Sequence, residues 1–414
     1  METQKQQLSV REVLRIDAFR RLWLGQLISL TGDFLAVFAV LAVATYQFHG
    51  TPVQLTLINV SFLLPFAVIG PLAGVFVDGW NPRRAMIGSD LIRAALILLL
   101  LVAPGLHAIY VILLSLSVVS TFFVPAQTIM LRTVVPPEGL MSANALMQQA
   151  MQLVRVLAPF LAGTLVAVTG ARPVYVFDSL SFLFSAAMIA AIALDWRTTA
   201  PQQQKQRTVS STLSELKEGV KFIFTHPSVS FVVLSLTAGM FAISSFGPLV
   251  AVYVRDFLQK DETIFGVVNT LIGVGMITGT LFIARFARTR SKKNLVIEGL
   301  LGIGLSVALM AMIVSLPVAL LGALGIGFGS GFLMVAANTI IQQETPMELA
   351  GRVSSSVWAL MSMAQLFGLA LAGAVAQRFG ILLMFYFSAA FLTLIAVFGF
   401  FQLSRQPAPG VAES

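Results

Sequence analysis

The sequence predicts an all-α integral membrane protein built from two pseudo-symmetric bundles of six transmembrane helices. Three observations support this prediction. Of its 414 residues, 57% are hydrophobic and only 11% are charged, whereas soluble domains carry about 25% charged residues. The hydrophobic residues gather in segments close to the roughly 20 residues that cross a bilayer. The second half of the chain also repeats the spacing of the first half at an offset of 210 residues.

The repeat is clearest around the Leu-Ala-Gly sequence at 161–163, which recurs at 371–373. A Pro-x-Glu sequence precedes both copies at the same distance, and Gly170 and Gly380 follow them. Many transporters use duplicated helical bundles to place one site between two halves that move against each other. The repeat therefore predicts a transporter.

Twelve apolar segments are each long enough to cross a bilayer. They are 20–48, 52–77, 85–104, 108–131, 143–170, 172–194, 229–255, 263–287, 294–314, 317–343, 353–378 and 381–403. The outer loops are short, so a substrate has to be handled within the helices. A receptor with an extracellular ligand-binding domain would look different.

A polar stretch at 195–228 divides the chain between the sixth and seventh segments. We expect an N-terminal bundle at 1–194, a cytoplasmic linker at 195–228, and a C-terminal bundle with its tail at 229–414. The linker part at 212–224 begins with a predicted capping box of Thr212 and Glu215 and has one apolar face. It predicts an amphipathic helix along the cytoplasmic membrane surface.

Lys and Arg residues are distributed unevenly between the two membrane sides. With the N-terminus inside, the outer loops hold only Arg172, Arg255, Lys260 and Arg378, and the apolar segments contain Arg93 and Arg155. The inner side therefore carries the other 20 of the 26 basic residues. The positive-inside rule then predicts that both termini are cytoplasmic. Because the net charge of +8 reflects topology, we expect no nucleic-acid partner.

Several classes of chemistry are excluded by what the sequence lacks. It contains no cysteine, its three histidines are far apart, and it has no Gly-x-x-x-x-Gly-Lys-Ser/Thr phosphate loop. We therefore expect no metal, no cofactor and no enzymatic activity. A proton gradient is the expected energy source.

Ionisable side chains inside a bilayer are costly unless they are paired or hydrated, so they mark candidate sites. Asp33 lies midway along the first segment, and Gln26 and Ser29 precede it on the same helix face. We expect Asp33 to line a central cavity, where it exchanges protons or contacts a cationic or hydroxyl-bearing substrate. The alternative is a permanently paired structural carboxylate.

The fifth segment carries a polar stripe that we expect to face the same cavity. Its members are Asn144, Gln148, Gln152 and Arg155, and their counterparts 210 residues later are Ser354, Trp358, Ser362 and Gln365. Arg155 lies at a depth similar to that of Asp33, which predicts a mutual ion pair. Since the second stripe has no charge, charge coupling is predicted in the N-terminal half. Trp358 provides either adaptable substrate contact or simple packing.

Further charges lie in apolar segments. Asp90 and Arg93 are three residues apart, which predicts a local ion pair near the cytoplasmic face. Asp178 lies beside Ser179 and Ser181, so we expect a structural hydrogen-bond network there.

The loop after the second segment reads Gly74-Val-Phe-Val-Asp78-Gly-Trp-Asn-Pro-Arg83-Arg84. It resembles the signature loop of the major facilitator superfamily, Gly-x-x-x-Asp-Arg-x-Gly-x-Arg-Arg. The matching residues are Gly74, Asp78, Arg83 and Arg84, whereas Gly79 replaces the first basic residue and Asn81 the glycine. The resemblance implies a cytoplasmic latch between the halves that breaks as the transporter turns inward. We expect Asp90 and Arg93 to belong to this cytoplasmic gate.

A second match lies in the fifth segment, where 158–163 resembles a degraded Gly-Pro-x-x-Gly-Gly antiporter motif in Pro159 and Gly163. The match implies export. Three further stretches resemble the branch containing the macrolide efflux proteins and the enterobactin exporter. They are Phe19 to Gln26 leading to Gly32-Asp33, Pro125-Ala126-Gln127 through Ala143 to Leu146, and Asp178 followed by Ser181-Phe182.

Together these features predict a monomeric transporter in a bacterial inner membrane. We expect it to export a small amphipathic compound, either drug-like or a secondary metabolite, by proton antiport with alternating access. Multidrug resistance is the associated phenotype. Three alternatives stay open: a siderophore exporter that uses Arg155 to neutralise anionic cargo, a lysophospholipid flippase, and a non-transporting membrane sensor.

Overall fold

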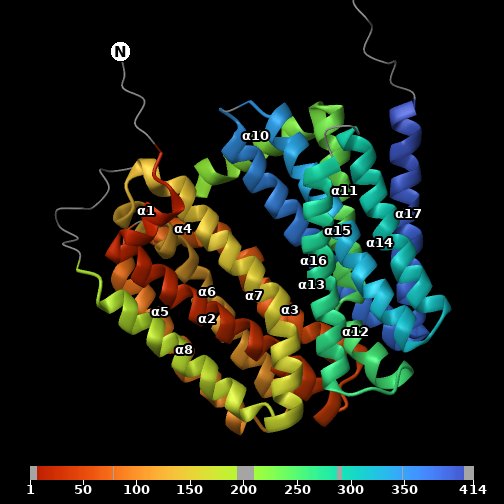
Figure 1. Ribbon diagram of the computed structural model, residues 1–414, viewed down its shortest axis with the longest axis horizontal. Helices are drawn as coiled ribbons and strands as arrows, with labels where there is room; N and C mark the ends of the chain where they lie inside the picture. The colour runs from red at the N-terminus through yellow and green to blue at the C-terminus, as the bar shows by residue number, and fades with distance from the viewer. Residues whose placement is uncertain (1–6, 78, 194–208, 287–290, 347, 405–414) are drawn as a thin grey trace, which may run out of the picture. The chain divides into compact units, whose positions relative to one another are not determined.

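The computed structural model describes residues 7–77, 79–193, 209–286, 291–346 and 348–404, and within these ranges it contains helices and no strand (Figure 1). The predicted all-α fold is therefore confirmed. Each of the twelve predicted segments coincides with one helix or with consecutive helices. Among the described residues, ten helices are long and apolar enough to span a membrane. The other two predicted segments, 52–77 and 143–170, coincide with α3 to α4 and with α7.

Helices up to residue 190 build the N-terminal half. They are α1 (Val10–Arg15), α2 (Asp17–Ala42), η1 (Val43–Gln47), α3 (Pro52–Val68), α4 (Gly70–Val77), α5 (Pro82–Leu98), η2 (Leu99–Val102), α6 (Leu106–Val134), η3 (Pro137–Gly139), α7 (Leu140–Thr169) and α8 (Arg172–Ala190). The predicted segment 52–77 is interrupted between α3 and α4. Pro71 explains the break, because it has no N–H to donate to the carbonyl of Ala67.

The C-terminal half contains α10 (Val209–Thr225), α11 (Pro227–Phe246), α12 (Leu249–Val252), η4 (Tyr253–Phe257), α13 (Glu262–Phe286), α14 (Lys292–Met312), α15 (Leu316–Glu344), α16 (Ala350–Phe379) and α17 (Ile381–Ser404). Helix α10 begins three residues before Thr212. The predicted capping box is therefore wrong, because Thr212 lies inside the helix and not at its N-cap.

The chain divides into two compact units. The first comprises Met1–Gly50, Leu57–Thr212 and Asp261–Gly266, and the second comprises Thr51–Thr56, Leu213–Lys260 and Val267–Ser414. Helix α10 thus packs with the second unit from Leu213 onward. Its side chain Ile223 is fully buried there, and Ser356 of α16 donates a hydrogen bond to the Leu216 carbonyl.

The 210-residue repeat is also present in the backbone. The π-helical turns η1 and η4 occupy equivalent positions, as do the long helices α7 and α16. His49 and Gln259 follow the π-helical turns with φ of 47° and 54°, a conformation that non-glycine residues seldom adopt. Gly170 and Gly380 end α7 and α16 with φ of 77° and 87°. These matched irregularities confirm the pseudo-symmetry that the sequence predicts.

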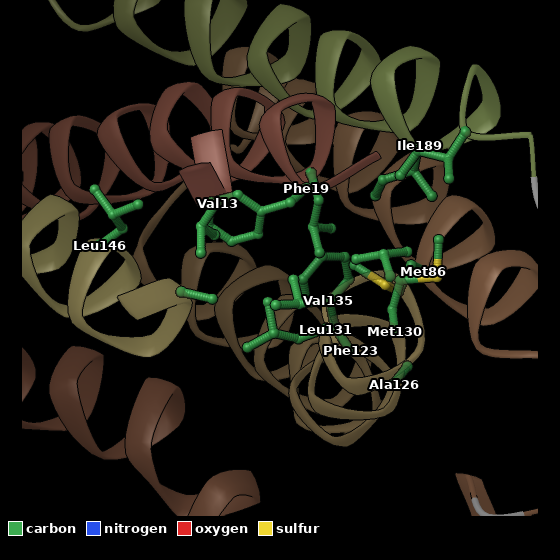
Figure 2. Packing of buried hydrophobic residues seen from close by; sticks show 14 of the residues in the cluster. Val13, Phe19, Met86, Phe123, Ala126, Met130, Leu131, Val135, Leu146 and Ile189 are labelled. Carbon is green, nitrogen blue, oxygen red and sulfur yellow. The ribbon is translucent and has the colours of Figure 1, made fainter. Parts of the chain in front are cut away.

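A buried apolar cluster joins the helices of the first unit at one end (Figure 2). It brings together Val13 of α1, Phe19 of α2, Met86 of α5, Met130 of α6 and Ile189 of α8. Of these helices, α2, α5 and α6 also border the cavity described below. The cluster therefore fixes the helices that position the candidate site.

Candidate functional site

The first unit contains a cavity of about 490 Å³ bordered by α2, α3, α5, α6 and α7. Most of its wall is apolar and includes Phe34, Phe62, Phe66, Phe123, Met147 and Met151. The polar groups on the wall are Gln26, Ser29, Asp33, Arg93, Ser120, Gln127 and Gln148. Apolar walls with a few placed polar groups are typical of small-molecule sites.

Four residues predicted for a cavity line this one: Gln26, Ser29, Asp33 and Gln148. Their roles stay predictions. Asn144 is exposed, and its amide donates to the Leu140 carbonyl of the same helix at 2.8 Å. Gln152, Arg155 and Pro159 lie in α7, but their side chains fall outside the described part of the structure.

The ion-pair partner that the structure gives Asp33 is Arg93 of α5. The Arg93 Nη1 atom lies 3.7 Å from Asp33 Oδ2, and Arg93 Nη2 donates to Asp90 Oδ1. The Asp33 side chain is 33% exposed, whereas those of Arg93 and Asp90 are 5% and 0% exposed. The predicted local pair of Asp90 and Arg93 therefore forms, and the predicted pair of Asp33 and Arg155 stays a prediction.

Arg93 and Asp90 lie in the interior of the first unit and not among exposed loop residues. The Arg93 guanidinium lies over the rings of Phe123 and Phe182, with centroid distances of 4.3 and 4.4 Å. Such cation–π contacts stabilise a desolvated cation. Both side chains point from α5 into the core beside Asp33, and their predicted place in a cytoplasmic gate stays a prediction.

A third carboxylate, that of Asp178 in α8, lies near Asp33 and Arg93. Its side chain is buried, and the Ser181 hydroxyl lies 3.2 Å from Asp178 Oδ1. Gly32 leaves room for this carboxylate, because a Cβ there would overlap Asp178 Oδ1. Ser179 donates instead to the Ala94 carbonyl of α5 at 2.9 Å. The predicted hydrogen-bond network thus includes Ser181 and ties α8 to α5.

A chain of amides connects the cavity wall to this cluster. Gln127 Nε2 of α6 donates to Gln26 Oε1 at 3.0 Å, and Gln26 Nε2 donates to Ser185 Oγ at 3.3 Å. The Ser185 hydroxyl lies beside the Asp90 carboxylate. Our sequence-based site omits Gln127, although it belongs to the stretch 125–127 that carries the family resemblance.

The other residues of the predicted cytoplasmic gate lie in and around α4 and the start of α5. Asp78 lies outside the described residues, and Gly74 lies in α4. Arg83 donates to the carbonyls of Ile189 and Ala190 at the end of α8, where cations are favoured. Asn81, which replaces the glycine of the signature, accepts the Arg84 N–H at 3.2 Å and caps α5. The departure from the signature therefore has a structural reason.

Gly163 of the antiporter-like motif permits close packing within the first unit. A Cβ there would lie 2.8 Å from the Glu262 carbonyl oxygen and 2.9 Å from Gly266 Cα. The stripe of Ser354, Trp358, Ser362 and Gln365 lies on α16 of the second unit, with Trp358 exposed. Among the described side chains of the whole protein, no group of three or more His, Cys, Asp or Glu has a geometry suited to a metal ion.

Comparison with known proteins gives consistent matches. A sequence profile described as Major Facilitator Superfamily matches residues 22–362. Macrolide efflux protein A of Streptococcus pyogenes is 23% identical over 391 residues, covering 92% of this chain and 94% of that protein. Multidrug efflux pump Tap of Mycolicibacterium fortuitum is 24% identical over 347 residues, covering 81% and 83%.

Solved structures match over nearly the whole chain. A bacterial homologue of the iron transporter ferroportin, in an inward-facing state, gives a TM-score of 0.73 at 17% identity and covers 95% of this chain and 100% of that one. The nucleoside transporter NupG gives a TM-score of 0.73 at 12% identity and covers 94% and 100%. At such identities the likeness establishes the fold alone.

Proposed function

The chain belongs to the Major Facilitator Superfamily, and from this premise we propose that it exports a small amphipathic compound in exchange for protons by alternating access. The relatives named as efflux proteins support an outward direction. The positive-inside distribution of Lys and Arg supports both termini in the cytoplasm, and the bacterial relatives support a location in a bacterial inner membrane. We propose that the transporter works as a monomer.

One observation carries the proposal: a partly exposed carboxylate, Asp33, on the wall of an otherwise aromatic and methionine-rich cavity. The cavity volume of about 490 Å³ suits a small organic molecule. Methionine and phenylalanine side chains accommodate varied apolar shapes. An acceptor such as Asp33 would orient a cationic or hydroxyl-bearing group of the cargo.

Proton and cargo would compete for the same carboxylate. Ionised Asp33 attracts a cationic cargo group, whereas protonated Asp33 does not. Two unit charges about 4 Å apart attract each other by about 4 kcal/mol at an effective dielectric constant of about 20. Protonation of Asp33 would remove an attraction of this order and so release the cargo. Asp90 would meanwhile keep the Arg93 guanidinium in place.

The proton gradient supplies enough energy for this exchange. One proton crossing about 150–200 mV provides roughly 3–5 kcal/mol. That free energy sustains a cargo gradient of about 10²–10³.

Transport by purified protein in vesicles tests the proposal, with erythromycin and ethidium as probes. Vesicles with an acidic interior should accumulate a probe as protons leave. Asp33→Asn should reduce this uptake to the level of protein-free vesicles while the variant unfolds at the wild-type temperature. Asp256→Asn, which neutralises an exposed carboxylate in η4, is the matched control and should transport normally. Uptake by Asp33→Asn against a gradient would refute the coupling role.

A further inference from the structure

Three carboxylates and a single guanidinium lie close together inside the first unit. Arg93 lies beside Asp33 and Asp90, and Asp178 lies beside Gly32, the neighbour of Asp33. If all three carboxylates were ionised, the cluster would carry two uncompensated negative charges. Desolvated charges without partners are very costly, and carboxylates that share a site do not all ionise together. At least one of the three acids should therefore hold a proton.

The contacts distinguish the three acids. Asp90 is fully buried but accepts directly from Arg93 within one helical turn. Asp33 lies 3.7 Å from Arg93 and has the cavity on its other side. Among the described residues, no cation lies within 4.0 Å of Asp178, whose side chain is sealed from the cavity. Asp178 thus has the weakest support for a negative charge.

We infer that Asp178 is a neutral carboxylic acid at every step of the cycle. It therefore contributes no charge of its own to the cluster. Asp90 and Arg93 then form a fixed ion pair, and Asp33 is the one carboxyl that gains and loses a proton. The assignment of the exchanged proton to Asp33 rests on the proposed function.

The groups facing Asp178 come from three helices. Asp33 of α2 and Arg93 of α5 act on it electrostatically, and Asp90 of α5 lies behind Arg93. On α8 itself, Ser181 supplies its hydroxyl, and Tyr175, one turn before Asp178, is buried. Removing a negative charge from Asp178 would favour ionisation of Asp33, whereas removing a neutral acid would leave Asp33 nearly unchanged.

Infrared spectroscopy of reconstituted protein carrying carbon-13 in its aspartate carboxyl groups tests the inference directly. The wild type should show a protonated aspartate C=O band that persists from about pH 5 to about pH 9, well above the ordinary range of aspartate. Asp178→Asn should remove this band. If that variant does not fold, Asp178→Glu should remove the labelled band as well. Absence of a persistent band in the wild type would overturn the inference.

The pH profile of transport gives the second readout. Asp178→Asn should shift the midpoint of probe uptake by less than about 0.3 pH unit, because one neutral group replaces another. Loss of a nearby negative charge would move the midpoint to lower pH by about one unit or more, and that result would contradict the inference. The infrared band does not depend on transport, so a wild type with the band but no proton-driven uptake would refute only the proposed antiport.

Discussion

Interior positions that are charged in the first bundle are uncharged in the second. Asp33, Asp90, Arg93 and Asp178 correspond, in order and 210 residues later, to Ile243, Leu300, Ile303 and Ser388. The last three of these are fully buried. The second bundle therefore builds the same helices without the charges, so the charges are not needed to form the bundle. Apolar residues often replace buried ion pairs without loss of stability, which agrees with the proposal that the first bundle uses its charges in transport.

The second bundle instead has close glycine packing between α14 and α15. A Cβ on Gly299 would lie 2.8 Å from the Gly329 carbonyl oxygen, and one on Gly329 would lie 2.7 Å from that of Gly299. The equivalent positions in the first bundle are Ser89 and Val119. In lipid, small residues allow the close van der Waals contact that holds helices together. The two bundles therefore share a helix arrangement but differ in their interiors, which contain charged side chains in the first and close glycine contacts in the second.

The strongest test of this comparison replaces the charges of the first bundle. Arg93→Leu should lower the free energy of unfolding by about 3–5 kcal/mol, because Asp90 loses its partner in a buried site. The double variant Asp90→Leu with Arg93→Ile copies the second bundle and should recover most of that loss. Both variants should fail to transport. Thermal unfolding in detergent measures the stability, and a double variant as unstable as Arg93→Leu would show that the first bundle does need its charges.

A smaller effect is expected from the glycine contact of the second bundle. Gly329→Ala should lower the free energy of unfolding by about 1–3 kcal/mol, because the new methyl group overlaps the Gly299 backbone. Gly88→Ala in α5 is the control, since no heavy atom lies within 4 Å of its added Cβ. It should be neutral or stabilising by about 0.5–1 kcal/mol. Equal destabilisation by both changes would contradict the conclusion that close glycine packing distinguishes the second bundle.

The fold could be predicted because its signals are long and redundant. Segment length, the Lys and Arg distribution and the repeat all concern whole helices, and none depends on a single contact. The exceptions are local. The break before Pro71 and the start of α10 at Val209 depend on a few backbone hydrogen bonds that hydropathy does not reveal.

The site could be predicted only in part, because its partners lie on different helices. Asp33 is evident as a charge within an apolar segment. Its contact with Arg93 depends on how α2 and α5 each pack against α8, whereas the sequence-based prediction chose Arg155 from its similar depth in the membrane. Gln127 carries no charge and has no distinctive spacing, so only its place in the family resemblance could have identified it. Pairing across helices is therefore where the structure adds most.

The smallest of the expected differences concerns the short helices that precede the first transmembrane helix of each bundle, α1 before α2 and α10 before α11. The segment that leads into α1 is held by Ser142, whose hydroxyl donates to the Leu8 carbonyl at 2.7 Å. At the equivalent positions 210 residues later, Arg352 forms an ion pair with Glu218 of α10. The side chains of Arg352 and Glu218 are 40% and 57% exposed. The same contact is therefore made by neutral groups in one bundle and by exposed charges in the other.

Salt should separate these two contacts. Exposed ion pairs contribute about 0–1 kcal/mol and are screened by salt, whereas a hydrogen bond between neutral groups contributes about 0.5–1.5 kcal/mol without such screening. Glu218→Gln should therefore weaken amide protection in α10 slightly at low ionic strength and not at about 1 M salt. Ser142→Ala should weaken protection in α1 equally at both. Hydrogen exchange with mass spectrometry measures each helix in the same sample. A salt-dependent effect of Ser142→Ala, or a salt-independent effect of Glu218→Gln, would contradict this assignment, because the two contacts would then not differ in charge as the structure indicates.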